Sequence, residues 1–304
     1  LLRGLEQAHH DGRILGEIVV VPVANPIGLN QHLNGRLLGR FDFASTGNFN
    51  RDFPDLTALA LDRVRGRLTM DPTANVALIR SALQAVLAAQ NPVRETTVLK
   101  QRLLSLAIDA DFVFDLHCDS EALLHLYASQ SQRAEAAALG AELGAAAILL
   151  EEEPGGRPFD QACAGPWRHL RDALAGEGPM PLACFATTVE LRGQADVNDQ
   201  QAAADAAALL RFLQRRGVLA GDPGPLPKLC CEPTPLDAVD VLVAPVAGVL
   251  VYGKVLGEQV RAGAIVAELV DPLGEPLGAA RTPVRAVTDG VLLTRMSERL
   301  ARPG

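Results

Sequence analysis

Two kinds of hydrophobic pattern alternate over the first 220 residues of the chain. Short, nearly continuous apolar runs are typical of buried strands, and they cover residues 17–23, 111–117, 122–128, 146–150 and 182–191. Segments with apolar residues at helical spacing lie between them, at residues 1–8, 57–108, 132–143, 158–175 and 199–215. This alternation predicts an α/β fold whose mostly parallel or mixed sheet is sandwiched by helices.

Proline, glycine and asparagine mark the breaks in this pattern. The helical segment 57–108 is expected to break at Asp71-Pro72 and at Asn91-Pro92, because proline cannot continue a helix. Residues 27–50 are rich in Gly and Asn and predict a long loop, and loops of this length are usually functional. Residues 221–237 are rich in Pro and Gly, a composition typical of a linker.

The pattern changes after the linker. Residues 238–304 contain short apolar runs separated by glycines and no helical spacing, which predicts a small all-β barrel or sandwich. We therefore predict a larger domain over residues 1–220 and a small β domain over residues 238–304.

Composition narrows the class of protein. The chain has 304 residues, of which 48% are hydrophobic and 21% charged, the balance of a globular protein. A net charge of −8 argues against a nucleic-acid partner, and no apolar run reaches the roughly 18 residues of a membrane span. Five cysteines without paired C-x-x-C spacing indicate free thiols, and the chain has no signal-type start, so we expect a reducing, cytoplasmic location.

Two predicted strands end on residues that can carry chemistry. Residues 111–117 end on Asp115-Leu116-His117, where the histidine can bind a metal; the alternative is a histidine satisfied by a loop backbone. Glu190 lies near the end of the apolar run 182–191, where a carboxylate is costly unless it has a partner or a function. It can act as a general base, or it can form an ion pair with Arg192 or another arginine.

Asn50 and Arg51 close the long loop. Arginine offers a planar fork for a carboxylate and asparagine a directional donor, while the alternative is an ordinary surface arginine. Three other features favour structural interpretations. Cys118 should point away from His117, His9-His10 should be a solvated helix end, and Glu151–Glu153 should be a solvated run of charge.

Taken in order, these segments resemble the succinylglutamate desuccinylase/aspartoacylase family, relatives of the zinc carboxypeptidases. The matching pieces are Val20–Pro26 with Gly28, Arg40-Phe41, Asn50–Pro54, Asp115–His117 and Thr188–Gly193, followed by Ala244–Gly248, Gly263 and Thr288–Gly290 in the predicted β domain. Each piece alone is weak. Their order over nearly the whole chain makes the resemblance specific.

The resemblance implies a zinc-carboxypeptidase-like fold and a metal-dependent hydrolase that cleaves the amide bond of a small N-acyl amino acid, with one Zn²⁺ per chain. His117 matches a zinc ligand, and Glu190 matches the residue that activates the attacking water. Asn50 and Arg51 match the pair that holds the substrate carboxylate, and Arg40 matches the arginine that polarises the scissile carbonyl.

One motif of the family does not occur in the chain. The first zinc motif, His-x-x-Glu, is not present between Leu1 and Asn25. We expect it upstream of Leu1, because the chain has no initiator Met and starts inside a helical pattern. Two alternatives stay open: a zinc carboxypeptidase that acts on peptides, and a metal-free binding homologue.

The predicted β domain also resembles the biotinyl and lipoyl carrier barrels. Such carriers present a lysine at a hairpin tip, whereas the corresponding turn here is Val270–Gly274, without lysine. We therefore expect no covalently attached cofactor. The expected roles of this domain are to cover the mouth of the site or to assist a homo-oligomer.

Overall fold

A five-stranded mixed sheet forms the centre of the computed structural model, which describes residues 1–153, 155–275 and 280–304. Its strands, in spatial order, are β3 (Phe112–Asp119), β7 (Phe185–Gly193), β5 (His125–Ala128), β6 (Ala147–Leu150) and β8 (Thr234–Pro235). The pair β5–β7 is antiparallel and the other pairs are parallel. The predicted mixed α/β fold is thus confirmed, and β3 forms one edge of this sheet.

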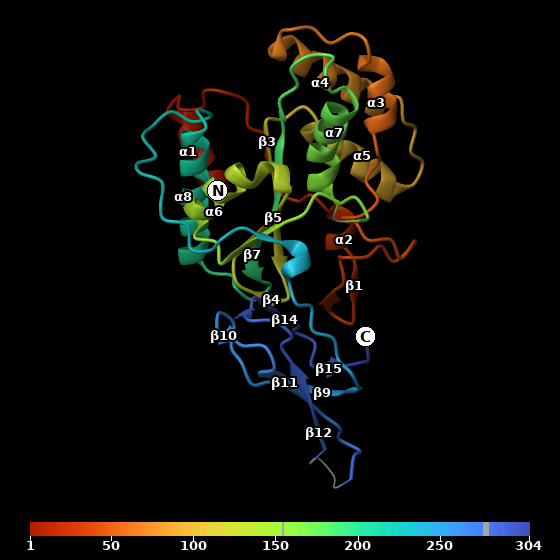
Figure 1. The fold of residues 1–304 in the computed structure, drawn as a ribbon, viewed down its shortest axis with the longest axis vertical. Coiled ribbons are helices and arrows are strands. Elements are labelled where there is room, and N and C mark those ends of the chain that lie inside the picture. The colour runs from red at the N-terminus through yellow and green to blue at the C-terminus, as the bar shows by residue number, and fades with distance from the viewer. Residues whose placement is uncertain (154, 276–279) are drawn as a thin grey trace.

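Helices flank both faces of the sheet (Figure 1). One face carries α3 (Thr57–Val64), α4 (Pro72–Ala88), α5 (Glu95–Ala107) and α7 (Phe159–Ala173). The other carries α1 (Leu2–His10), α6 (Arg133–Leu143) and α8 (Asp199–Arg215). Two hydrophobic cores result because successive strand residues alternate between faces: Ala186 packs with Trp167 of α7, and Phe185 packs with Phe212 of α8.

Local sequence chemistry explains where several helices begin and end. The Asp71 side chain accepts a hydrogen bond from the backbone N–H of Thr73, and Pro72 occupies the first position of α4. The Asn198 side chain caps α8 by accepting from the N–H of Gln201. Gly144, with φ 64°, ends α6 in the left-handed conformation that glycine adopts easily.

The strand predicted at residues 17–23 is wrong. In the described part of the chain these residues form no strand and pair with none. A β-branched apolar run favours a strand only when a neighbouring strand accepts its backbone hydrogen bonds, and here the side chains of Val19, Val20, Val21 and Val23 are exposed. The predicted loop at residues 27–50 is confirmed in most of its length; it contains the short helix α2 (Pro26–Leu29) and the hairpin of β1 (His32–Leu33) and β2 (Arg36–Leu37).

The described residues after Ala238 form strands and no helix, as their pattern predicts. An antiparallel sheet has the order β12 (Arg281–Arg285), β11 (Ile265–Val270), β9 (Gly248–Tyr252) and β15 (Leu300–Ala301). A second pair joins β10 (Gln259–Val260) and β13 (Gly290–Val291). These strands lie at the lower end of the molecule in Figure 1.

A short strand pair joins the C-terminal strands to the central region. β14 (Thr294–Arg295) pairs with β4 (Glu121–Ala122), directly after β3. The carboxylate of Glu121 forms ion pairs with Arg295, at 2.7 Å, and with Arg299. The C-terminal strands therefore contact the chain next to the end of β3 that carries His117.

Two further expectations concern membrane-spanning helices and disulfide bonds. Of the helices in the described ranges, none has both the length and the apolarity needed to cross a membrane. None of the five cysteines forms a disulfide bond in the structure.

Candidate functional site

Candidate side chains meet at the ends of β3 and β7. His117 pairs in register with Glu190, and Asp115 pairs with Thr188, across these parallel strands. Residues paired in this way present their side chains on the same face of a sheet. Val113 and Ala186, which share this face, pack against α7, so the site lies on the α7 side of the sheet.

His117 is held by a carboxylate and an amide. Its Nε2 lies 2.8 Å from Oδ2 of Asp115, and Nδ2 of Asn50 lies 3.4 Å from the same oxygen and 3.5 Å from Nε2. Burial alone would lower the pKa of His117, but the hydrogen bond and charge of Asp115, with the charge of Glu190, raise the pKa above its ordinary value. The alternative of a histidine satisfied by a loop backbone is wrong.

Glu190 is half-buried, and its Oε2 atom has no hydrogen-bond partner among the described residues. Burial raises the pKa of Glu190; the charges of Asp119 and Asp115 raise it further, while those of His117 and Arg40 oppose the shift. A carboxyl group with a free oxygen and a raised pKa suits a group that takes up a proton.

The alternative ion pair between Glu190 and Arg192 is wrong. Arg192 instead makes a bidentate pair with Asp205 of α8, with N–O distances of 2.8 and 3.0 Å. Arg192 was the expected partner because it is close to Glu190 in sequence. The pair does not form, because the backbone at Arg192 directs its side chain away from Glu190.

The loop that carries Asn50 and Arg51 is fixed from several sides. Asn50 Oδ1 accepts a hydrogen bond from the N–H of Phe159 at the start of α7, at 2.9 Å. Arg51 is half-buried, and its Nη1 donates to the carbonyl of Asn50 at 2.7 Å. The N–H of Asp52 donates to the carbonyl of Gly156 at 2.6 Å. Arg51 is thus partly buried in this loop, and its role as a carboxylate ligand stays a prediction.

Lys100 is a buried residue that our sequence reasoning missed. Its Nζ donates to the carbonyls of Arg51, at 2.6 Å, and Asn48, at 3.2 Å, and the residue is only 8% exposed. Burial lowers the pKa of Lys100, and the charge of Asp52 opposes that shift. The sequence could have indicated this burial, because Lys100 lies four residues before Leu104, a spacing that places both on the same, buried face of α5.

Two more side chains of the site were missed. Asp160 lies in the first turn of α7 and is buried; this burial, with the nearby charge of Asp115, raises its pKa to about 6. Tyr127 of β5 pairs in register with Thr188, and burial with the charge of Glu190 raises the pKa of its phenol to about 12. The helix start and the strand were predicted, but not which residues of the two would meet.

These residues line one cavity of about 1290 Å³. The five predicted site residues all contribute to its wall: Arg40, Asn50, Arg51, His117 and Glu190. Arg40 is exposed, and its guanidinium carbon lies 5.8 Å from the ring centre of Phe41. The structure therefore brings the five together, while the chemical role of each remains a prediction.

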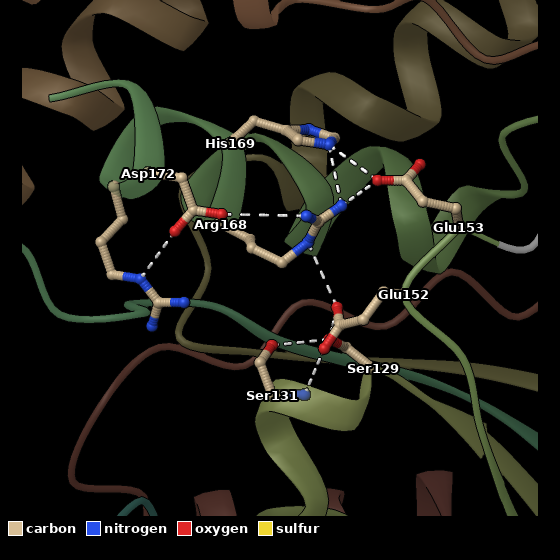
Figure 2. Close-up of polar contacts among 8 residues, drawn as sticks. Ser129, Ser131, Glu152, Glu153, Arg168, His169 and Asp172 are labelled. Carbon is tan, nitrogen blue, oxygen red and sulfur yellow. Dashed lines mark hydrogen bonds and ion pairs between the residues drawn. The ribbon is translucent and has the colours of Figure 1, made fainter. Parts of the chain in front are cut away.

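A second polar cluster lies beside the site, around Arg168 of α7 (Figure 2). Arg168 Nε lies 3.2 Å from the carboxylate of Glu152, and Arg168 also pairs with Glu153. Glu152 accepts hydrogen bonds from the N–H of Ser131, at 2.5 Å, and from Oγ of Ser129, at 2.6 Å. The predicted solvated run Glu151–Glu153 is therefore wrong for Glu152, which Arg168 and the two serines hold, while Glu153 is exposed although it pairs with Arg168.

Two described residues just before α7 contact the Arg51 loop directly. Arg157 Nε donates to the carbonyl of Phe53 at 3.0 Å, and the backbone of Gly156 abuts Arg51.

Solved structures share this architecture over almost the whole chain. One, from Shewanella amazonensis and assigned to the succinylglutamate desuccinylase/aspartoacylase family, is 27% identical with a TM-score of 0.86, covering 99% of this chain and 83% of that chain. A second structure, from Shewanella frigidimarina and assigned to the same family, is 24% identical with a TM-score of 0.86, covering 99% of this chain and 82% of that chain. The chain is a structural relative of the succinylglutamate desuccinylase/aspartoacylase family.

A more distant structure supports the fold alone. The product-bound ectoine utilization protein EutE (DoeB) from Ruegeria pomeroyi is 17% identical with a TM-score of 0.64, covering 98% of this chain and 77% of that chain. No protein-family model matches the chain, and no curated protein does.

The resemblance to the succinylglutamate desuccinylase/aspartoacylase family implies a zinc ion. A catalytic zinc site needs about three protein ligands. Within residues 1–153, 155–275 and 280–304, no three His, Cys, Asp or Glu side chains are grouped so that they could hold a metal ion. His117 is the single predicted ligand, and its Nε2 faces Asp115. The described residues do not fit a complete zinc centre, and zinc remains a prediction.

Proposed function

We propose that the protein is a hydrolase that cleaves the amide bond of a small N-acyl amino acid. The main observation behind this proposal is the carboxyl group of Glu190, whose Oε2 is buried without a partner in the described part of the chain. Glu190 lines the same cavity as Asn50 and Arg51. The 27% identical Shewanella amazonensis structure supports this class of activity through its family assignment.

Asn50 and Arg51 bind the substrate carboxylate in this proposal. The guanidinium of Arg51 offers a charged, planar donor fork, and the Asn50 amide adds a second donor. Asn50 is oriented by the N–H of Phe159, at 2.9 Å, so its amide group points toward Asp115 and His117. Holding the carboxylate at this place aligns the amide bond with the reacting groups.

Glu190 takes the proton of the attacking water and returns it to the leaving amine. Its raised pKa makes the carboxylate a stronger base than an exposed glutamate and lets the protonated form act as an acid. Arg40 lies close enough to oppose that pKa shift, and we propose that it stabilises the oxyanion that develops on the carbonyl.

The remaining expectations stay proposals. They are one Zn²⁺ per chain with His117 as a ligand, a small-molecule substrate without nucleic-acid or membrane partners, a cytoplasmic location, and a homo-oligomer. Metal analysis of protein expressed from its complete reading frame tests the first.

The test of the proposed function is a substrate panel with a Glu190→Gln variant. N-acetyl and N-succinyl amino acids are compared with short peptides, using protein expressed from the complete reading frame. We expect turnover of an N-acyl amino acid, and a loss of about 100- to 10,000-fold in kcat for the variant. Glu6→Gln, at an exposed glutamate of α1, is the matched control and should keep full activity.

Each of three results would contradict part of the proposal. Hydrolysis of peptides without hydrolysis of N-acyl amino acids would favour the carboxypeptidase alternative. Binding of an N-acyl amino acid without any turnover would favour a binding homologue. Near wild-type activity of Glu190→Gln would remove the role assigned to that residue.

A further inference from the structure

The backbone of Arg192 adopts a conformation that is rare for a residue with a side chain. Arg192 is the second residue after Glu190 in β7, and its φ is 74°. This left-handed region is disfavoured for residues other than glycine, and it persists only where surrounding contacts enforce it. Such outliers often lie at functional sites.

The Asp205 carboxylate holds the side chain of Arg192. Both of its oxygens accept from Arg192, at 2.8 and 3.0 Å, and the two side chains are 22% and 12% exposed. This hydrogen bonding raises the pKa of Arg192. A bidentate pair of a guanidinium and a carboxylate is both strong and directional, and here it is partly shielded from water.

A register shift decides which face of the sheet receives the guanidinium: between the pairs His117–Glu190 and Asp119–Gly193, β7 has one residue more than β3, and the left-handed backbone of Arg192 lies in this step. Along a regular strand, residues two apart point to the same face, so Arg192 would share the face of Glu190. Instead its side chain reaches α8, the helix that packs on the opposite face through Phe212. The turn therefore separates the nearest arginine in sequence from the carboxyl group of Glu190.

The residues after Arg192 continue this fixed exit from β7. The Gly193 backbone passes so close to the β3–β4 turn that a Cβ atom would lie 2.9 Å from the Ser120 carbonyl oxygen. The N–H of Gln194 donates to the carbonyl of Asp119 at 2.9 Å, and Gln194 lines the cavity. Glu190 is thus the last site residue before a turn that is anchored on both sides.

We propose that the Arg192–Asp205 pair is a positioning device for Glu190. It holds the exit of β7 in its left-handed turn, and it keeps the Arg192 guanidinium from pairing with the free Oε2 of Glu190. Loss of Asp205 releases Arg192 to return to strand geometry and to form an ion pair with Glu190, which then no longer serves as the base. This inference rests on the proposed function.

The experiment uses the variant Asp205→Ala and the double variant Asp205→Ala/Arg192→Gly. For Asp205→Ala we expect kcat to fall by about 10- to 100-fold, with KM within about twofold, because the base is displaced and the carboxylate clamp is not. In the double variant glycine adopts the left-handed turn without strain and the competing guanidinium is gone, so we expect kcat to recover to within about threefold of wild type. A purely structural role for the pair would not be rescued by a second deletion.

The matched control is Glu135→Gln, which breaks the ion pair that Arg216 makes at the other end of α8. It should change stability without changing kcat. An unaltered kcat in Asp205→Ala, or a double variant no better than the single one, would overturn the proposal.

A second measurement keeps the two proposals distinguishable. If the wild-type protein hydrolyses no substrate of the panel, the proposed function fails, and amide hydrogen exchange then decides on the positioning device. Faster exchange over residues 190–194 in Asp205→Ala, with a return to the wild-type rate in the double variant, supports the positioning role. Unchanged exchange there overturns it.

Discussion

Lys100 gives the sharpest test of how the Arg51 loop is held. Its ammonium group lies under the loop and donates to two backbone carbonyls, those of Arg51 at 2.6 Å and Asn48 at 3.2 Å. The substitution Lys100→Met keeps an unbranched apolar side chain of similar length and removes the charge and both donors. Since the residue is only 8% exposed, water does not simply replace the ammonium group.

The magnitude follows from the two carbonyls that the substitution leaves behind. A hydrogen bond to a charged group contributes about 1.5–3 kcal/mol, and a buried acceptor left without a partner costs about 1–3 kcal/mol. The bond to Asn48 is the longer of the two, and the loop can shift to admit water. We therefore expect Lys100→Met to lower the free energy of unfolding by about 2–4 kcal/mol.

The same change should weaken substrate binding. The carbonyl that Lys100 holds belongs to Arg51 itself, so a shift of the loop moves the proposed carboxylate clamp. A displacement of about 1 Å in a positioning group can cost about 100-fold, and we expect KM for an N-acyl amino acid to rise at least about tenfold. The effect on kcat should be smaller, because Glu190 lies on another element.

The assay pairs urea unfolding with steady-state kinetics. Lys100→Arg retains a cation with several donors and should lose less in both measurements, and Lys228→Met, at an exposed lysine, should lose nothing. A stability loss with an unchanged KM would show that Lys100 holds the fold but does not set the clamp. An unchanged free energy of unfolding would refute the reasoning about the two carbonyls.

Two further predictions concern Asp160 and Arg168. Because burial raises the pKa of Asp160 to about 6 from its ordinary value of 3.8, the folded state binds this proton more tightly than the unfolded chain does. The free energy of unfolding should therefore fall as pH rises from about 4 to about 6, by up to about 3 kcal/mol, and Asp160→Asn should lack this decrease. Urea unfolding at pH 4, 5 and 7 measures the decrease. Equal pH dependence in the wild-type protein and the variant would contradict the prediction. Arg168→Met should destabilise the protein by about 1–3 kcal/mol and raise KM, because Glu152 loses its cation and the segment that braces Arg51 loosens. The control Arg171→Met, at a more exposed arginine of the same helix, should change neither stability nor KM. A KM unchanged by Arg168→Met would exclude the link to the site.

The helices and most strands of the central sheet followed from patterns that act locally. Asp71-Pro72 predicts a break in the helical segment 57–108, and in the structure Asp71 caps α4, which begins at Pro72. The region 17–23 shows where such patterns stop being sufficient. An apolar, β-branched run predicts a strand only if another strand lies beside it, and pairing is a property of the whole fold.

The site was predictable in its residue types and less so in its contacts. His117 and Glu190 end apolar strands, and the register of β3 against β7 places them side by side. The partner of Arg192 could not be predicted, since the left-handed backbone directs the side chain to α8 rather than to Glu190. Glu152 likewise pairs with Arg168, a residue of another element.

Charge at the site follows from how each nearby arginine is held, and not from the net charge of −8. Arg192 is taken by Asp205, Arg51 is oriented by the carbonyl of Asn50, and Arg40 lies over Phe41. In the described part of the chain, none of the three forms an ion pair with Glu190. An acidic protein can therefore present two arginines to an anionic substrate and still keep one carboxylate free to accept a proton, provided that each guanidinium has its own fixed place.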